Sequence, residues 1–593
     1  MRILFLTHAF NSLTQRLYAE LREDGHEISI EFDINDAVTE EAVAAYRPEV
    51  VVAPFLKRAI PATVWQRHRC LIVHPGIVGD RGPSALDRAI LRDEARWGVT
   101  VLQATGEMDA GPVWATVEFA TRAATKSSLY RNEVTDAALL AVRQALQRVA
   151  AGAAPAPLNA ADPGVRGCSH PLLRQAERAI DWSRDDTAVI LCKIHAADGF
   201  PGVRDEIAGV PCFLFDAHGE ALLDARGAPP GAVLATRHGA VCRATLDGAV
   251  WFGHVKRADV PEAFKLPAVL ALGAALSGVP EVPLAPEAVV TGATFRDIAY
   301  EESGPVGYLH FPFYNGAMAT HQCERLRAAY AHARQRPTRV IVLMGGPDFW
   351  SNGIHLNVIE NAEHPAEESW RNINAMNDLV RDIVETGTHL TIAAMRGNAG
   401  AGGAFLALAA DRVYARSAIV LNPHYKSMGN LYGSEYWTYL LPRRVAAEAA
   451  RALVANRLPL TARAAQALGL VDEAFGPSLP EFEAGVRARA QALATATDFS
   501  AVLAATNTRR KADEARKPLA AYREEELARM KLNFFGFDPS YHVARYHFVA
   551  KVPRSRTPLH LALHRRPSSP GGEAGARPGV SANASVAAVM HDA

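Results

Sequence analysis

Residues 397–411 constrain the fold of this chain more than any other stretch. Four glycines lie within seven residues there, after the apolar run 390–395 and before a run with helical character. Glycine permits positive φ and close backbone approach, so a strand, glycine loop and helix in this order can aim backbone amides at a ligand. Such amides can serve a phosphate or a developing oxyanion. Tight packing is the alternative that this stretch, taken alone, leaves open.

A second segment, residues 342–357, lies upstream, and a third, residues 460–472, lies downstream. In this order the three segments resemble the crotonase (enoyl-CoA hydratase/isomerase) superfamily over residues 285–550. The resemblance implies an α/β spiral domain with a thioester oxyanion hole made by the amides of Ile354 and Gly402. It also implies a coenzyme A (CoA) site. Its expected contacts are Gly353, Ile354, His355, Leu356 and Gly402.

The two glutamates that hydratases of this superfamily use are absent. The first position holds Phe405, and the second falls on His424 or Tyr425. Water addition to a double bond is therefore not expected. Tyr425 and Glu435 are candidate replacement acid–base groups, because a buried glutamate among aromatic side chains has a raised pKa. The alternative is a carboxylate on a solvated helix face.

Length and composition place the chain among ordinary water-soluble proteins. Its 593 residues predict about three or four domains, and 49% of the residues are hydrophobic. The net charge of zero argues against nucleic acid or an anionic membrane as the main partner. The six cysteines lack metal-ligand spacing, so we expect free thiols and no metal site. The first residues do not have a signal-peptide pattern and the apolar run 266–276 is too short to span a membrane, so a cytoplasmic protein is expected.

Residues 1–150 alternate short apolar runs with amphipathic stretches. Strands are predicted at 3–7, 27–32, 50–53 and 71–74, and helices at 12–23, 40–46 and 86–95. This alternation predicts an α/β domain with a doubly wound parallel sheet. Ligands of such sheets bind at the carboxyl ends of the strands, which is where His74 falls.

Residues 71–90 and 98–113 resemble the formyltransferases that use 10-formyltetrahydrofolate. The resemblance implies that His74 and Asp109 are catalytic, while Ile72 stands where that family has an asparagine. Either another donor replaces this amide, or the transfer chemistry is altered. Formyl transfer passes through a tetrahedral intermediate, to which an imidazole can donate, and a carboxylate can orient that imidazole. The expected folate contacts are Pro54, Phe55, Leu56, Arg81 and Gly82.

The remaining segments connect or flank these two parts. Residues 150–163 indicate a linker, and residues 164–258 predict a small β-barrel of the oligonucleotide-binding type, which we interpret as scaffold and folate-side wall. Residues 258–288 cross to the crotonase-like part. Residues 507–530 predict a solvated charged helix, and the aromatic and basic stretch 531–551 is a candidate for packing back across the domain junction. Residues 567–593 predict a disordered tail.

The combined modules resemble the HoxX-type hydrogenase maturation proteins over about residues 1–550. This implies formyl transfer from 10-formyltetrahydrofolate to CoA, and then cleavage of formyl-CoA to carbon monoxide and CoA for nickel–iron hydrogenase. Hydrogenase maturation proteins or the hydrogenase large subunit are the implied partners. Two alternatives stay open: a formyltransferase for another acceptor whose second half senses CoA, and a non-catalytic maturation scaffold.

Overall fold

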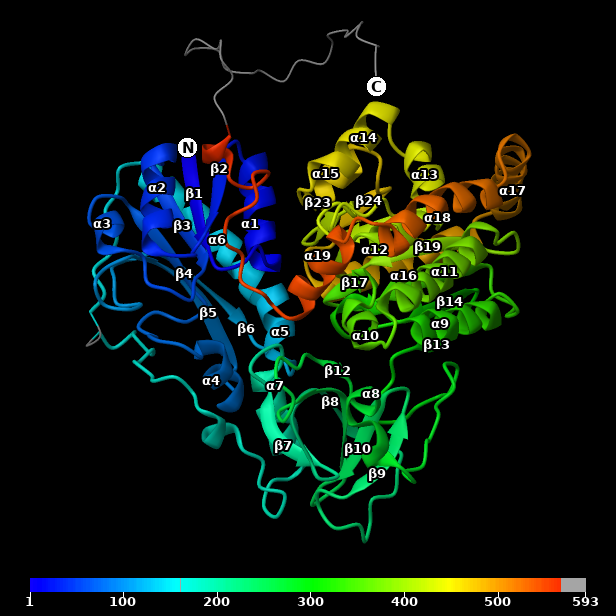
Figure 1. Cartoon of the computed structure of the whole chain (residues 1–593), viewed down its shortest axis with the longest axis horizontal. Helices are drawn as coiled ribbons and strands as arrows, with labels where there is room; N and C mark the ends of the chain where they lie inside the picture. Colours follow the sequence, from blue (N-terminus) through cyan, green and yellow to red (C-terminus); the bar gives the residue numbers. More distant parts are fainter. Residues whose placement is uncertain (160–161, 567–593) are drawn as a thin grey trace, which may run out of the picture.

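The computed structural model describes residues 1–159 and 162–566, so the predicted tail at 567–593 lies outside the described residues. The described chain forms three parts, each built on its own sheet (Figure 1). The α/β multidomain architecture expected from the sequence is confirmed. Among the described residues, no helix combines the length and apolar character needed to cross a membrane.

The N-terminal part is a six-stranded sheet in the order β2-β1-β3-β4-β5-β6. The first four of these strands are parallel, and their carboxyl ends share one edge. These four are the strands predicted from the sequence, whereas β5, which was not predicted, runs antiparallel to both of its neighbours, β4 and β6. Residues 104–112 join β5 to β6 without a helix, which an antiparallel pair allows. The strands are β1 Arg2–Thr7, β2 Glu27–Phe32, β3 Val50–Phe55, β4 Cys70–His74, β5 Arg96–Gln103 and β6 Val113–Ala120. The helices are α1 Ser12–Glu23, α2 Asp36–Tyr46, α3 Ala62–Trp65, α4 Ala85–Leu91, α5 Lys126–Leu129, the π-helical turn η1 Tyr130–Val134 and α6 Thr135–Ala150.

The second part is a curved antiparallel sheet in the order β7-β8-β11-β10-β9, with β12 paired to β11 (Figure 1). Its strands surround an apolar core that α7 covers. The elements are α7 Thr187–Ala197, β7 Val203–Ile207, β8 Val210–Glu220, β9 Val233–Arg237, β10 Ala240–Ala244, β11 Ala249–Arg257, β12 Leu266–Pro267 and α8 Ala268–Leu272.

The third part alternates between two sheets, which produces the spiral expected for a crotonase-like chain. The main sheet has the order β13-β14-β16-β19-β21-β24, and a smaller sheet has the order β17-β20-β22-β23. Each of β16, β19 and β21 is followed by a strand of the smaller sheet. The main strands are β13 Ala299–Ser303, β14 Val306–His310, β16 Val340–Gly345, β19 Leu390–Met395, β21 Arg412–Arg416 and β24 Glu473–Phe475. The shorter strands are β15 Ala317–Met318, β17 Phe349–Ser351, β18 Gly353–Ile354, β20 Asn398–Gly400, β22 Val420–Asn422 and β23 Leu460–Thr461.

Helices cover the spiral and continue beyond it. They include α9 Thr320–Ala333, α10 Leu356–Asn361, α11 Pro365–Val384, α12 Gly402–Leu408, α13 Trp437–Leu440, α14 Ala447–Asn456, α15 Ala462–Ala467, α16 Leu479–Thr495, α17 Phe499–Arg516, α18 Leu519–Phe535 and α19 Ser540–Val549. The single solvated helix predicted at 507–530 is therefore two helices, and α18 buries Glu526 and Met530. The reason is that α18 packs on α11 and α13.

Side-chain hydrogen bonds join the first and third parts near α1 and near η1. Near α1, the Gln15 side chain accepts a hydrogen bond from Asn422 Nδ2 at 2.9 Å. Near η1, Asp348 Oδ1 accepts hydrogen bonds from Ser128 Oγ at 2.7 Å and from Asn132 Nδ2 at 2.9 Å. The smaller sheet of the spiral therefore faces the N-terminal part directly.

A C-terminal strap, residues 552–566, returns from α19 to the N-terminal sheet and lies along β2 (Figure 1). Ile30 N donates to Leu561 O at 3.0 Å and Phe32 N donates to Thr557 Oγ1 at 2.8 Å. His564 lies between Ser29 and Glu31, with ring nitrogens 2.7 and 2.9 Å from their oxygens. The strap thus covers the edge strand of the first sheet.

Candidate active sites

The first candidate site is centred on His74, at the carboxyl end of β4. Its Nε2 lies 2.9 Å from Asp80 Oδ2 and its Nδ1 lies 3.6 Å from Asp109 Oδ2. His74 and Asp80 are both buried. Both ring nitrogens therefore face carboxylate oxygens, which fixes the orientation of the imidazole. Sequence reasoning placed His74 and Asp109 here but gave Asp80 no role.

Backbone geometry around this site requires two glycines. A Cβ on Gly76 would lie 2.3 Å from His74 Nε2, so no larger residue fits beneath the imidazole. Gly82 has φ +96° and its amide donates to Asp109 Oδ2 at 3.1 Å. Asp109 itself has φ +52°, a strained conformation for a non-glycine residue that this hydrogen bond helps to hold.

The residues predicted to contact folate lie at the same edge of the sheet. Phe55 ends β3, and its carbonyl accepts hydrogen bonds from His8 N at 2.6 Å and Thr7 Oγ1 at 3.2 Å. Pro54 is in β3, and Leu56 follows it and packs on the neighbouring apolar core. The Arg81 guanidinium donates to Glu107 at 2.8 Å.

Ile72 is two residues before His74 on β4, so the two side chains share one face of the strand. This face carries a hydrocarbon where the formyltransferase pattern has an amide. Ile72 packs on the same apolar cluster as Leu56. The departure seen in the sequence is therefore a hydrophobic replacement within the wall of the site.

The second candidate site is the junction of β18 with the start of α12. A Cβ added to Gly353 would lie 3.3 Å from Gly402 N, so the two predicted oxyanion segments are adjacent. Gly402 opens α12, where a helix offers no carbonyl partner for its first amides. Ala401, just before it, has φ +46° and ψ −130°. This strained residue turns the chain into the helix and so sets the direction of the Gly402 amide.

Glu435 lies against this turn. A Cβ on Gly402 would be 2.3 Å from Glu435 Oε1, and Glu435 Oε2 lies 2.5 Å from the hydroxyl of Tyr425. Glu435 is only 1% exposed. Burial raises the pKa of Glu435 to about 8 and, together with the neighbouring carboxyl, raises the pKa of Tyr425 well above its ordinary value.

The hydrogen bonds of Tyr425 indicate where the proton of this pair resides. Its hydroxyl lies 2.9 Å from Ser434 O and 2.5 Å from Glu435 Oε2. A phenol has one proton, and a carbonyl oxygen can only accept. Both contacts are satisfied when Tyr425 donates to Ser434 O and a protonated Glu435 donates to the phenol oxygen. The short distance and the raised pKa of Glu435 agree with this arrangement.

The positions used by hydratases hold no acid. The Phe405 ring stacks on Tyr425 at 5.3 Å between ring centroids. Burial lowers the pKa of His424 to about 4 and that of His355 to about 3. His355 Nδ1 accepts from Val358 N at 3.3 Å and so caps α10, which Leu356 begins.

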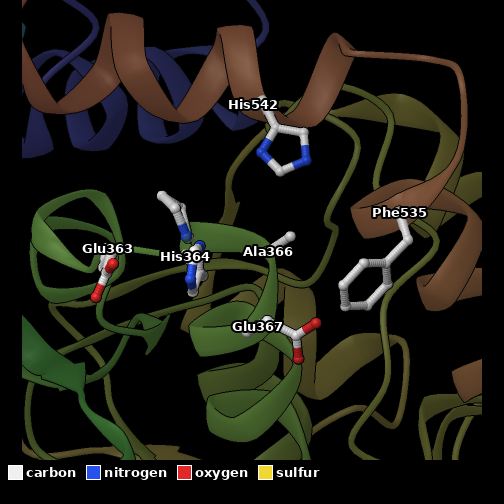
Figure 2. A pocket seen from close by; sticks show the side chains of 7 residues that line it. Glu363, His364, Ala366, Glu367, Phe535 and His542 are labelled. Atoms are coloured by element: carbon white, nitrogen blue, oxygen red, sulfur yellow. The ribbon is translucent and has the colours of Figure 1, made fainter.

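A surface pocket lies apart from both sites, between the start of α11 and the helices α18 and α19. Figure 2 shows Glu363 and His364 before α11, Glu367 on its first turn, Phe535 opposite and His542 above them. It contains none of the residues predicted from the sequence to bind or react.

Comparison with protein families matches each of the three parts. The Formyl transferase model matches residues 31–146, the Formyl transferase C-terminal domain model matches 172–263, and the Enoyl-CoA hydratase/isomerase model matches 308–534. The chain is also similar to Methionyl-tRNA formyltransferase of Ralstonia nicotianae, at 30% identity over 233 residues, 38% of this chain and 68% of the relative. The fold and the family matches thus define a pair of formyltransferase-like domains joined to a crotonase-like module.

Two relatives share the whole arrangement. Hydrogenase maturation factor HoxX of Bradyrhizobium diazoefficiens is 56% identical over 573 residues, 96% of this chain and 98% of the relative. HypX from Aquifex aeolicus, solved in complex with tetrahydrofolic acid, is 48% identical with a TM-score of 0.92, covering 95% of this chain and 99% of that one. The chain belongs to the HoxX/HypX family of hydrogenase maturation factors.

Proposed function

We propose that this protein makes carbon monoxide for the active site of nickel–iron hydrogenase in two steps. A formyl group passes from 10-formyltetrahydrofolate to CoA at the first site, and formyl-CoA is split to carbon monoxide and CoA at the second. The observation that carries the proposal is the Tyr425–Glu435 pair against Gly402, in a crotonase-like fold without hydratase acids. The solved relative that holds tetrahydrofolic acid supports folate as the donor.

In the first step, the CoA sulfur attacks the formyl carbon and the bond from that carbon to the folate nitrogen breaks. The thiol proton ends on the folate nitrogen. Asp80 holds Nε2 of His74 at 2.9 Å, whereas Nδ1 lies 3.6 Å from Asp109, too far for a hydrogen bond, so Nδ1 would donate to the oxygen of the tetrahedral intermediate or move this proton. Asp80 and Asp109 orient the ring and offset the charge that it gains.

In the second step, the C–H and C–S bonds of the formyl thioester break and carbon monoxide leaves. The sulfur gains one proton as the formyl carbon loses one, so no oxidant or reductant is consumed. The amides of Ile354 and Gly402 would hold the carbonyl oxygen as its charge develops. Glu435, protonated at the start, would give its proton to the departing sulfur, and the pair that it forms with Tyr425 would take up the formyl proton in its place, for which a carboxyl group with a pKa of about 8 is suited.

A group of cations supports CoA, with its phosphates, as the acceptor. Arg131 comes from the first part, Lys265 from the chain that leaves the second, and Lys551 from the C-terminal end of the third. Burial lowers the pKa of Lys265 to about 8; Asp198 and Asp216 oppose this change, while Arg131 and Lys551 contribute to it. Asn357 Nδ2 donates to Lys265 O at 2.8 Å, which places Lys265 beside the segment that follows Ile354.

The test is capture of carbon monoxide by reduced haemoglobin. Purified protein with both 10-formyltetrahydrofolate and CoA should give the carbonyl spectrum, and omission of either substrate should abolish it. Formate in place of carbon monoxide would contradict the second step. A formylated product without any CoA requirement would favour a formyltransferase for another acceptor. The absence of all turnover would favour a maturation scaffold.

The proposal also fits a cytoplasmic protein that delivers carbon monoxide to hydrogenase maturation proteins or to the hydrogenase large subunit.

A further inference from the structure

Glu526 is a buried acid in α18, about ninety residues beyond Glu435. It is the last of three consecutive glutamates, of which Glu524 and Glu525 are exposed while Glu526 is 1% exposed. Carboxylates are almost never fully buried without partners. The helix therefore turns one of three like acids into the core for a specific contact.

That contact is the loop that carries Glu435. Glu526 Oε2 accepts from Tyr436 N at 2.9 Å, while its Oε1 accepts from Thr438 N at 2.9 Å and from Thr438 Oγ1 at 2.6 Å. Each oxygen thus accepts from a backbone amide, a group that can only donate. The carboxylate also caps the first turn of α13, which begins at Trp437.

The loop needs such support because its backbone is strained. Glu435 and Tyr436 have φ +59° and +56°, two consecutive non-glycine residues in the left-handed region. From the other side, Asn377 Oδ1 in α11 accepts from Glu435 N at 2.8 Å and from Ser434 Oγ at 3.0 Å. Glu435 is thus held between two buried polar side chains from different helices.

Glu526 acts on Glu435 through its negative charge as well as through its hydrogen bonds. Three donors favour the ionised form of Glu526, whereas the carboxyl of Glu435 meets a single hydroxyl, that of Tyr425, so Glu435 is the better place for a proton. Burial raises the pKa of Glu526 to about 7, and the Glu526 charge adds to the burial that raises the pKa of Glu435.

Other charged or titratable groups lie around this pair. Tyr425 and Tyr432 face Glu526 from the loop. Along α18, Arg523 is paired with Asp378 of α11 at 2.6 Å, and Arg529 lies near Tyr432. Since Arg523 is already paired, Glu526 is the buried acid that acts on Glu435 from this side.

We propose that Glu526 is a positioning residue for formyl-CoA cleavage, which holds the Glu435 backbone in place and keeps the Glu435 carboxyl protonated at neutral pH. The inference rests on the proposed function of the second site. Without the negative charge of Glu526, Glu435 would lose its proton at lower pH. Without the hydrogen bonds that Glu526 accepts, the strained turn would relax.

The test is the pH profile of carbon monoxide release from supplied formyl-CoA, for the native chain, Glu526→Gln and Glu524→Gln. In Glu526→Gln, the midpoint assigned to Glu435 should move to lower pH by about one unit or more, because a nearby like charge is removed. The maximal rate should fall about tenfold or more as the turn relaxes. Glu524→Gln changes the same charge on the exposed face of the same helix, so its profile should overlay the native one.

A second pair of variants covers the case in which Glu526→Gln does not fold. Thr438→Val removes one donor to Glu526 and should shift the midpoint in the same direction by less, while Thr438→Ser keeps the donor and the native midpoint. Formyl transfer at the first site serves as the check on folding. Equal midpoints in folded native, Glu526→Gln and Thr438→Val proteins would overturn the inference. No carbon monoxide from the native chain would instead overturn the proposed function.

Discussion

The hydroxyl of Tyr425 and Oε2 of Glu435 are 2.5 Å apart, and the carboxyl of Glu435 packs on the Cα of Gly402. Hydratases of the superfamily have carboxylates at the positions of Phe405 and of His424 or Tyr425, whereas here the carboxylate is that of Glu435. The ring of Phe405 stacks on Tyr425, and both residues of the pair are buried.

Removal of the phenol should stop cleavage of formyl-CoA. In Tyr425→Phe, Glu435 loses the hydrogen-bond partner that orients it, so carbon monoxide release should fall about 100-fold or more. Release is measured with reduced haemoglobin on supplied formyl-CoA. Tyr432→Phe, which alters a neighbouring half-buried phenol, is the matched control. An unchanged rate in Tyr425→Phe would exclude a role for the hydroxyl.

Glu435 should make the protein less stable as the pH rises. Its pKa is raised by burial from an ordinary 4.5 to about 8. Between these values the folded chain keeps a proton that the unfolded chain releases, so the contribution of Glu435 to stability is present at low pH and is lost as the pH rises toward 8. Relative to the native chain, Glu435→Gln should gain at least ~1 kcal/mol of unfolding free energy between pH 5 and 8. Urea titrations at both pH values measure this, and parallel changes in the two proteins would contradict it.

In the turn before α12, substitutions of two adjacent residues should affect different properties, activity at Gly402 and stability at Ala401. Gly402→Ala should abolish carbon monoxide release, because its Cβ would overlap Glu435 Oε1, while formyl transfer at the first site persists. Ala401→Gly should raise the free energy of unfolding by about 1 kcal/mol, since φ +46° favours glycine. Thermal unfolding checks the second change, and a lower melting temperature would show that Ala401 is unstrained.

The first site should depend on Asp80 as well as on the residues that the formyltransferase pattern marks. His74→Ala should slow consumption of 10-formyltetrahydrofolate about 100-fold or more, because it removes the imidazole that carries the proton. Asp80→Asn should slow it about tenfold, because it weakens the contact that orients this imidazole. Asp36→Asn, an exposed acid paired with Arg58, is the control. Each variant should still split supplied formyl-CoA. Full transfer activity in Asp80→Asn would assign that residue to structure alone.

Asp348 should couple the two reactions without taking part in either. It accepts hydrogen bonds from Ser128 and Asn132 across the contact of the first and third parts. Asp348→Ala should loosen this contact, so that formyl-CoA is released into solution and the yield of carbon monoxide per formyl group falls. Chromatography of CoA esters during turnover measures the leak. Asp224→Ala, at an exposed ion pair of the second part, should leave the yield unchanged.

Much of this architecture was predictable because local chemistry specifies it. The glycine run around Gly402 works through backbone geometry, which any sequence with those glycines must provide, and the strand ending at His74 has a clear apolar pattern. The direction of β5 and β6 was not predictable, because periodicity gives strands but not how they pair.

The supporting acids were also missed. Glu526 sits in a run of like charges that ordinarily marks a solvated face, and Asp80 was given no role. Their importance arises only when tertiary packing buries them beside His74 and the Glu435 loop. The signal that was available for Asp80 is its position between Gly79 and Gly82, in a turn at the ligand-binding edge of the sheet.

The strap along β2 has a consequence for how the protein is made. Ser29 and His564, which meet in this contact, are 535 residues apart in the chain. During synthesis the edge of the first sheet therefore stays open until almost the whole of the crotonase-like part has emerged. An open strand edge is a site for pairing with other chains. A chain that ends before the strap would keep that edge exposed to pairing with other chains.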